Sequence, residues 1–172
     1  MRRESSAPIG QVKGDLRMAK RYWLMKSEEE VYSIRDMEND GVTCWEGVRN
    51  YEARNLMRDE MKKGDWVLFY HSNATPPGVA GVVEVSKEAY PDYFAFVTKS
   101  KYFDSKSDPD NPRWFMVDVT FKEAFSEVVS LNEIKASPKL KDMVLVKRAR
   151  LSVQPVTKEE FDAIRKMGKE KK

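Results

Sequence analysis

The richest group of ligand-binding side chains lies between residues 45 and 55, where the chain reads Trp-Glu-Gly-Val-Arg-Asn-Tyr-Glu-Ala-Arg-Asn. Its first six residues combine an aromatic ring, a glycine, a guanidinium group and a residue type that begins helices. Trp45 can stack on a base, Gly47 allows close backbone approach, and Arg49 and Asn50 can donate to a phosphate or a base edge. The pattern favours a site for a flat, polar ligand with negative charge beside it, such as a nucleotide.

A second polar group, Tyr70-His71-Ser72-Asn73, follows the apolar run that begins at Trp66. His71 is the only histidine, so a site that needs two imidazoles is excluded within one chain. A lone histidine in a strand is often a packed, hydrogen-bonded side chain. Its place at a strand end nevertheless favours a recognition rim that presents hydroxyl, imidazole and amide groups together.

The sequence contains no recognised catalytic signature, and we predict no catalytic residue, no metal and no cofactor. Three aspartates, Asp104, Asp108 and Asp110, lie in one segment, but its prolines and turn-forming residues explain them and the calcium-loop pattern is absent. Cys44 is the only cysteine and is interpreted as a small core residue rather than a nucleophile. A single cysteine also indicates a reducing, intracellular environment.

The net charge of +3 hides an uneven distribution. Residues 1–21 carry six basic and two acidic side chains, and residues 165–172 carry five and one. The chain between these ends holds 20 basic and 25 acidic residues, a net charge of −5. This balance argues against a domain that grips a long phosphate backbone by general positive charge, so any nucleic-acid contact should be local.

At 172 residues the chain fits one domain. We expect a disordered basic leader over residues 1–20, the folded domain over 21–168 and a basic tail over 169–172. No apolar run approaches the length of a membrane span, and residues 1–17 lack a secretory signal. The expected protein is an intracellular monomer, cytoplasmic in a bacterium or nuclear in a eukaryote.

Several short elements should position the first group of side chains. We predict a strand at Tyr22–Met25 and then a helix with a capping box, Ser27 at its N-cap and Glu30 at its third residue. Thr43–Trp45 should be extended. Asn50 should cap a helix that reaches Lys63, where Gly64 ends it.

Downstream, the apolar pattern changes to a period of two, which is typical of strands. The run from Trp66 to His71 is apolar on both faces and predicts a strand covered on both sides. Further strands are predicted at Val79–Val85, near Tyr93–Val97, at Phe115–Phe121 and at Leu151–Pro155, with helical segments at Leu131–Leu140 and after a Thr157–Glu160 capping box. Short strands interrupted by helices indicate an α+β domain with a small mixed β-barrel.

Several motifs, in order, resemble the EVE domain family. They are Tyr22–Glu28, Trp45–Tyr51 with Ala53–Asn55, Gly64–Asp65, Phe69–Asn73, Pro76–Gly78, Glu88–Asp92, Asn111–Trp114 and Arg150–Val156. The resemblance runs from about Tyr22 to Met167. It implies a PUA-like fold, a small mixed β pseudo-barrel with flanking helices and one concave pocket, as in the related YTH and ASCH domains.

EVE domains are regarded as nucleic-acid binders, so the resemblance implies a non-enzymatic reader of a modified base in DNA or RNA, such as methylated or hydroxymethylated cytosine. The base would be flipped from its stack against Trp45. By analogy with YTH pockets, four segments should line the cavity, and their residues are Lys26, Ser27, Trp45, Gly47, Val48, Arg49, Asn50, Tyr70, His71, Ser72, Arg150, Ser152 and Gln154.

The chain departs from the family pattern at Glu29, where proline is common, and at Glu52, where glutamine is common. A carboxylate only accepts hydrogen bonds, so we leave Glu52 out of the site. Two other functions stay open. One is an ASCH-like nuclease that uses Lys26, Tyr70 or His71 as acid or base, and the other is a protein-interaction adaptor with a vestigial pocket.

Overall fold

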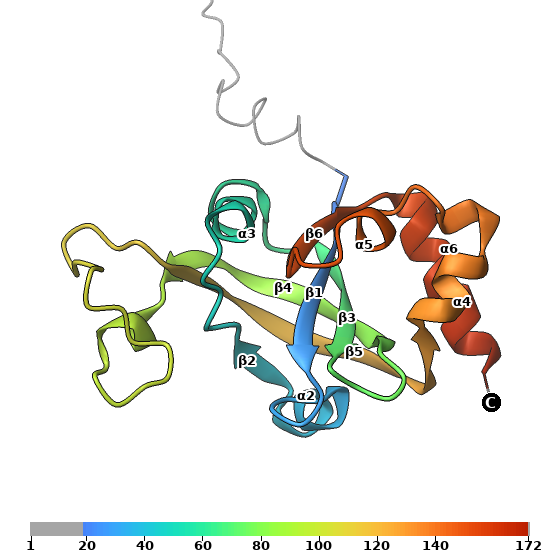
Figure 1. Ribbon diagram of the computed structural model, residues 1–172, viewed down its shortest axis with the longest axis horizontal. Helices are drawn as coiled ribbons and strands as arrows, with labels where there is room; N and C mark the ends of the chain where they lie inside the picture. Colours follow the sequence, from blue (N-terminus) through green and yellow to red (C-terminus); the bar gives the residue numbers. More distant parts are fainter. Residues whose placement is uncertain (1–18, 172) are drawn as a thin grey trace, which may run out of the picture.

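The protein is a mixed sheet of six strands with helices around it (Figure 1), described by a computed structural model for residues 19–171. The strand order is β2-β5-β4-β3-β1-β6; β1 and β3 run parallel, and every other neighbouring pair is antiparallel. The strands are β1 (Tyr22–Glu28), β2 (Val42–Cys44), β3 (Trp66–Ser72), β4 (Gly78–Pro91), β5 (Phe115–Ser130) and β6 (Val153–Val156). The predicted α+β, PUA-like class is confirmed. Most of the expected leader, residues 1–18, and the final residue of the expected tail lie outside the described residues.

The two longest strands give the sheet its curvature. β4 has 14 residues and β5 has 16, and the register between them shifts at four places. Each such irregularity bends the strand and increases its twist, so β4 and β5 curl instead of forming a flat ribbon. The sequence predicted only the first half of β4, Val79–Val85, and the first part of β5, Phe115–Phe121.

Side chains from β1 and β3 enter two separate cores on opposite faces of the sheet. Trp23 and Phe69 belong to one apolar cluster, and Leu24 and Leu68 belong to the other. Neighbouring residues of a strand point to opposite faces, which explains this division. The prediction that the strand from Trp66 is covered on both sides is therefore confirmed.

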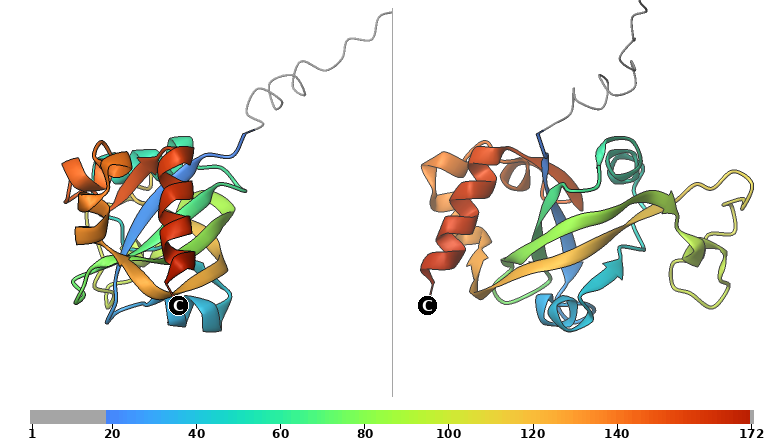
Figure 2. Two further views of the ribbon diagram at one scale, coloured as in Figure 1. Left: turned by 90° about the vertical axis from the view of Figure 1, so that its right-hand side faces the viewer. Right: turned by 180° about the vertical axis from the view of Figure 1, so that it is seen from behind.

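The helices are short apart from the last. They are α2 (Ile34–Asp40), α3 (Tyr51–Asn55), α4 (Leu131–Ala136), α5 (Val144–Lys147) and α6 (Lys158–Glu170), with a π-helical turn at Leu56–Glu60 and 3₁₀ turns at Tyr93–Phe96 and Pro138–Leu140. The predicted capping box of α6 is present, because the Thr157 hydroxyl accepts from the Glu160 N–H at 3.1 Å and the Glu160 carboxylate accepts from the Thr157 N–H at 3.0 Å. Figure 2 shows α6 running along one end of the sheet. None of the helices in the described range combines the length and apolar character needed to cross a bilayer.

The predicted helix after Ser27 is wrong in its start. β1 continues through Glu28 because it pairs with β3 up to Ser72, and the Ser27 hydroxyl donates to the Tyr32 carbonyl at 2.6 Å. The capping box used instead is Ser33 with Asp36, three residues into α2. Both Ser27 and Ser33 have an acidic residue three positions later, as a capping box requires, and the long-range pairing of β1 with β3 leaves only Ser33 free to start the helix.

Two further element predictions need correction. Tyr93–Phe96 is a 3₁₀ turn, not a strand, and the Asp92 carboxylate caps it by accepting from the Phe94 N–H at 3.0 Å. Asn50 does cap its helix, accepting from the Ala53 N–H at 2.9 Å, but helical structure ends at Glu60 after the π-helical turn. Beyond residue 92 the chain forms a long excursion, residues 93–113, that extends past the sheet in Figures 1 and 2.

Candidate base-binding pocket

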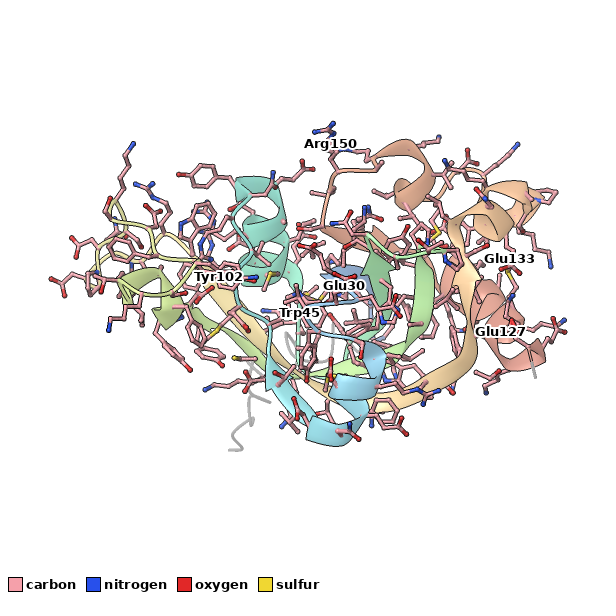
Figure 3. The ribbon with its side chains drawn as sticks, turned by 60° about the horizontal axis from the view of Figure 1, so that its bottom comes forward. Glu30, Trp45, Tyr102, Glu127, Glu133 and Arg150 are labelled. Atoms are coloured by element: carbon pink, nitrogen blue, oxygen red, sulfur yellow. The ribbon has the colours of Figure 1, made fainter. Side chains whose placement is uncertain are left out.

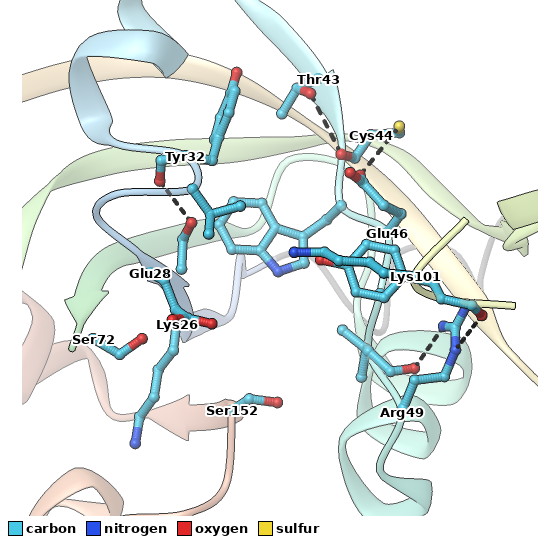
Figure 4. A pocket seen from close by; sticks show the side chains of 16 residues that line it. Lys26, Glu28, Tyr32, Thr43, Cys44, Glu46, Arg49, Ser72, Lys101 and Ser152 are labelled. Atoms are coloured by element: carbon cyan, nitrogen blue, oxygen red, sulfur yellow. Dashed lines mark hydrogen bonds between the residues drawn. The ribbon is translucent and has the colours of Figure 1, made fainter. Parts of the chain in front are cut away.

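A cavity of about 400 Å³ opens where the end of β1, the strand β2 and the segment after it meet (Figure 4). Its walls come from five parts of the chain and are Lys26, Ser27, Glu28, Val31, Tyr32, Thr43, Cys44, Trp45, Glu46, Gly47, Val48, Arg49, Ser72, Lys101, Tyr102 and Ser152. Eight of the thirteen site residues predicted from the sequence line it. These are Lys26, Ser27, Trp45, Gly47, Val48, Arg49, Ser72 and Ser152.

Trp45 belongs to both the core and the pocket wall. Its side chain packs edge-on against Phe69, with ring centroids 5.4 Å apart, and only 8% of the residue is exposed. The backbone N–H donates to the Val117 carbonyl at 2.8 Å, which fixes Trp45 beside β5. Among the described residues the indole N–H has no hydrogen-bond partner. The ring is therefore held rigidly, and it offers a donor to a ligand.

Arg49 is bound by the protein itself. Its guanidinium group donates to the Asp92 carboxylate at 2.9 Å and to the Tyr102 carbonyl at 2.8 and 3.2 Å. Asp92 is fully buried and also accepts from the Gly47 N–H at 2.9 Å. The bonds to Tyr102 join the segment after β2 to the excursion, and the ion pair fixes Arg49 at the residue before it, so Arg49 shapes the pocket and is not a free donor at its entrance.

Gly47 allows the excursion to approach the pocket. It has a φ of +87°, which favours glycine, and an added Cβ would lie 2.5 Å from the Tyr102 ring. A glycine is therefore needed at position 47 for two reasons: the backbone conformation, and the close contact with the Tyr102 ring. Tyr102 and the neighbouring Lys101 become part of the wall through this contact.

The opposite side of the pocket carries short polar side chains. The Lys26 ammonium group points away from the pocket centre in Figure 4 and donates to the Ala149 carbonyl. Burial lowers the Lys26 pKa. The hydroxyl groups of Ser72 and Ser152 make no hydrogen bond with any described residue. These two hydroxyl groups are available to a ligand, whereas the Lys26 charge is already engaged.

The third side is formed by Tyr32 and the residues before Gly47. Tyr32 donates to Asp40 at 2.8 Å, and burial together with this carboxylate raises the pKa of Tyr32 to about 12. Burial and the Glu46 carboxylate raise the pKa of the Cys44 thiol to about 11. Cys44 therefore stays protonated near neutral pH and is a wall residue with no nucleophilic character.

Five predicted site residues lie elsewhere. Asn50 and Arg150 border a different, smaller cavity. Tyr70 and His71 are 4% and 3% exposed and belong to the core, so the predicted recognition rim retains only Ser72. Gln154 is fully buried and donates to the Leu151 carbonyl at 2.8 Å. Ser72 is the last residue of β3 and is only partly buried, so it reaches the pocket although its neighbour does not.

His71 has a structural role, because it binds the start of α2. Its Nε2 atom accepts from the Ile34 N–H at 3.0 Å, at the first turn of α2, so the imidazole must be neutral. Its Nδ1 atom lies 3.7 Å from the Glu29 carboxylate. Burial lowers the His71 pKa, and the Glu29 charge opposes this in part.

This geometry makes stability depend on pH. Above the unfolded-state pKa of about 6.5 both states are neutral and the His71 contribution is complete; as the pH falls below it, the unfolded state binds the proton first and stability decreases. His71→Gln keeps an acceptor but does not titrate. When the pH is lowered from about 7.5 to about 5, we expect this variant to lose less unfolding free energy than the unchanged protein. Urea unfolding at the two pH values measures both losses. Equal losses in the two proteins would contradict this role.

The eight wall residues that sequence reasoning missed fall into two groups. Glu28, Val31, Tyr32, Thr43, Cys44 and Glu46 lie within five positions of a predicted site residue in the sequence, so their proximity was a usable signal. Lys101 and Tyr102 lie in the excursion, and nothing in their sequence indicates that it folds back onto Gly47.

A curved mixed sheet with flanking helices and a concave pocket at the end of β1 defines a PUA-like domain. The chain belongs to the EVE domain family, because the family model for the EVE domain matches residues 21–167. Over 162 residues it is 44% identical to human thymocyte nuclear protein 1. This alignment covers 83% of this chain and 72% of the human protein.

Solved structures agree with this assignment. The human THYN1 protein in complex with 5-methylcytosine containing DNA matches with a TM-score of 0.81 and 41% identity, over 89% of this chain and 100% of that chain. The YTH domain of Zygosaccharomyces rouxii MRB1 protein, in complex with N6-methyladenosine RNA, matches with a TM-score of 0.54 over 88% of each chain. Its 16% identity shows a shared fold alone.

Proposed function

We propose that this protein is a non-enzymatic module that binds nucleic acid and reads a modified base, methylated or hydroxymethylated cytosine, flipped into the Trp45 pocket. One observation carries the proposal: the pocket presents a fixed tryptophan opposite two serine hydroxyl groups, and neither its indole N–H nor these hydroxyl groups bond to any residue between 19 and 171. Its volume of about 400 Å³ lies within the range of small-ligand sites. The similar human protein was solved in complex with 5-methylcytosine containing DNA, which supports the same ligand class here.

The wall chemistry suits cytosine. The exocyclic amino group of cytosine is a donor, and carboxylates such as Glu46 are its usual acceptors. The apolar side chains of Val31 and Val48 provide a surface for a methyl group. Because similar proteins carry the name thymocyte nuclear protein 1, a nuclear location in a eukaryotic cell belongs to this proposal.

The alternative of an ASCH-like nuclease finds less support. Its candidate acids and bases were Lys26, Tyr70 and His71. Tyr70 and His71 are buried, and the His71 Nε2 atom already accepts from α2. The Lys26 ammonium group is bound to a backbone carbonyl. Because these three candidate acids and bases are buried or already hydrogen-bonded, the site favours binding over proton transfer by them.

The experiment is to fill the pocket without disturbing the core. Ser152 is a half-buried wall residue whose hydroxyl group has no partner in the described part of the chain, so Ser152→Phe should block the cavity. We expect at least about tenfold weaker binding of a single-stranded oligonucleotide that contains one 5-methylcytosine, measured by fluorescence anisotropy, because base stacking is lost.

The matched control is Ser126→Phe, at an exposed position of β5, which should bind like the unchanged protein. The unchanged protein should also prefer the methylated oligonucleotide over its cytosine counterpart. Equal binding of the two oligonucleotides, or undiminished binding by Ser152→Phe, would contradict the proposed function.

A further inference from the structure

A second cavity, of about 280 Å³, lies beside the proposed base pocket. It is formed by the turn after α5 and by the N-cap of α3, and its lining consists of Asn50, Lys147, Arg148, Ala149, Arg150 and Leu151. Three of these six residues are cationic and none is acidic. The lining therefore has the charge expected of an anion site.

The turn at residues 148–151 is held in place by hydrogen bonds to the Arg148 carbonyl. The Leu151 N–H donates to the Arg148 carbonyl at 3.3 Å, and the buried Gln154 amide donates to the same carbonyl at 3.2 Å. The N–H groups of Ala149 and Arg150 make no hydrogen bond with any described residue. A rigid turn with two unused N–H groups can bind an oxyanion without a large ordering cost.

The three cations that line this cavity differ in their availability to a ligand. Arg148 donates to both carboxylate oxygens of Glu52, at 2.6 and 2.8 Å, so these two charges neutralise each other. Lys147 forms an exposed ion pair with Asp142, which contributes little. Arg150 has no partner among the described residues and extends from the edge of the molecule in Figure 3.

The two cavities are neighbours, because residues that follow one another in the sequence line one cavity and then the other. Arg49 lines the first and Asn50 lines the second; likewise Ser152 lines the first and Leu151 the second. Lys26, a wall residue of the base pocket, donates to the Ala149 carbonyl of the turn. A nucleotide joins its base to its phosphates through one sugar, so neighbouring cavities of this kind can hold both parts of one strand.

We propose that the second cavity binds a backbone phosphodiester of the nucleic-acid strand next to the nucleotide whose base enters the Trp45 pocket. This inference rests on the proposed function. Arg150 and Lys147 supply the positive charge, and the turn N–H groups supply further donors. The site explains how a domain whose central part has a net charge of −5 holds a polyanion: its cationic contact is local.

The test compares two double variants with the same change in charge. Lys147→Gln/Arg150→Gln alters the lining of the second cavity, and Lys135→Gln/Lys139→Gln alters exposed lysines on and after α4. Figure 3 shows Glu133, another residue of α4, away from Arg150. Anisotropy titrations at several salt concentrations use single-stranded oligonucleotides with and without 5-methylcytosine. A separate tryptophan-fluorescence titration uses the free nucleoside 5-methyl-2′-deoxycytidine.

We expect the turn variant to bind both oligonucleotides about tenfold more weakly and to lower the slope of log affinity against log salt by about 0.7 per phosphate lost. Its nucleoside binding should equal that of the unchanged protein, since the base pocket is intact. An unchanged slope, or a loss no larger than that of the α4 variant, would overturn the phosphate site. Oligonucleotide binding that depends on the turn but not on methylation would instead overturn the proposed reading of modified bases.

Discussion

Replacing Trp45 by alanine is expected to weaken binding of a 5-methylcytosine oligonucleotide by a factor of about 5 to 150. The range follows from the roughly 1 to 3 kcal/mol that base stacking on an aromatic side chain contributes. The indole ring is fixed by Phe69 and the strand β5, so it can stack without further ordering. Anisotropy titration with the methylated oligonucleotide measures the loss.

The same change removes a large core side chain, because only 8% of Trp45 is exposed. We expect an accompanying loss of about 3 to 5 kcal/mol in unfolding free energy. Met57→Ala is the matched control, since Met57 is fully buried in the same apolar cluster and does not line the pocket. At a temperature where circular dichroism shows both variants folded, Met57→Ala should retain binding. Equal losses in the two variants would assign the Trp45 effect to the fold.

The sequence predicts local elements well where one residue determines them. Asn50 and Thr157 cap helices as expected, because a short polar side chain at a helix start satisfies a backbone N–H whatever lies around it. The same reasoning gave a wrong prediction at Ser27. It has the correct spacing to Glu30, but parallel pairing of β1 with β3 holds it in a strand, and such pairing depends on residues 44 positions away.

The candidate pocket was predictable in its central part. The segment from Trp45 to Arg49 is a continuous stretch of wall, so finding one residue there locates the others. Side chains in strands were harder, because His71 and Ser72 adjoin in sequence but only Ser72 lines the pocket. Tyr102 could not be located at all, since the path of a long loop depends on contacts that the sequence does not specify.

Arg49 shows how a residue type can mislead about its role. A guanidinium beside an aromatic ring and a glycine is typical of phosphate binding, and we predicted that use. In the structure its donors are taken by Asp92 and the Tyr102 carbonyl. Arg49 is therefore proposed to act indirectly, by holding the excursion that supplies one wall of the pocket.

Arg49→Ala is therefore expected to destabilise the protein by about 3 to 5 kcal/mol, measured by urea unfolding. Removing one member of a buried ion pair leaves the other charge without compensation. Here the Asp92 side chain is 0% exposed and that of Arg49 is 21% exposed. Asp92 would keep its hydrogen bonds from the Gly47 and Phe94 N–H groups, but the excursion would lose two bonds to the Tyr102 carbonyl.

Two variants isolate the cause of this loss. Arg58→Ala removes an exposed guanidinium that pairs with its neighbour Asp59, and it should change stability by about 0.5 kcal/mol or less. Arg49→Lys keeps the charge but cannot bond Asp92 and the Tyr102 carbonyl through one planar group, so we expect an intermediate loss. If Arg49→Ala cost no more than Arg58→Ala, the contacts of Arg49 with Asp92 and Tyr102 would not hold the excursion. The shape of the pocket would then have to depend on the packing of the Tyr102 ring against Gly47.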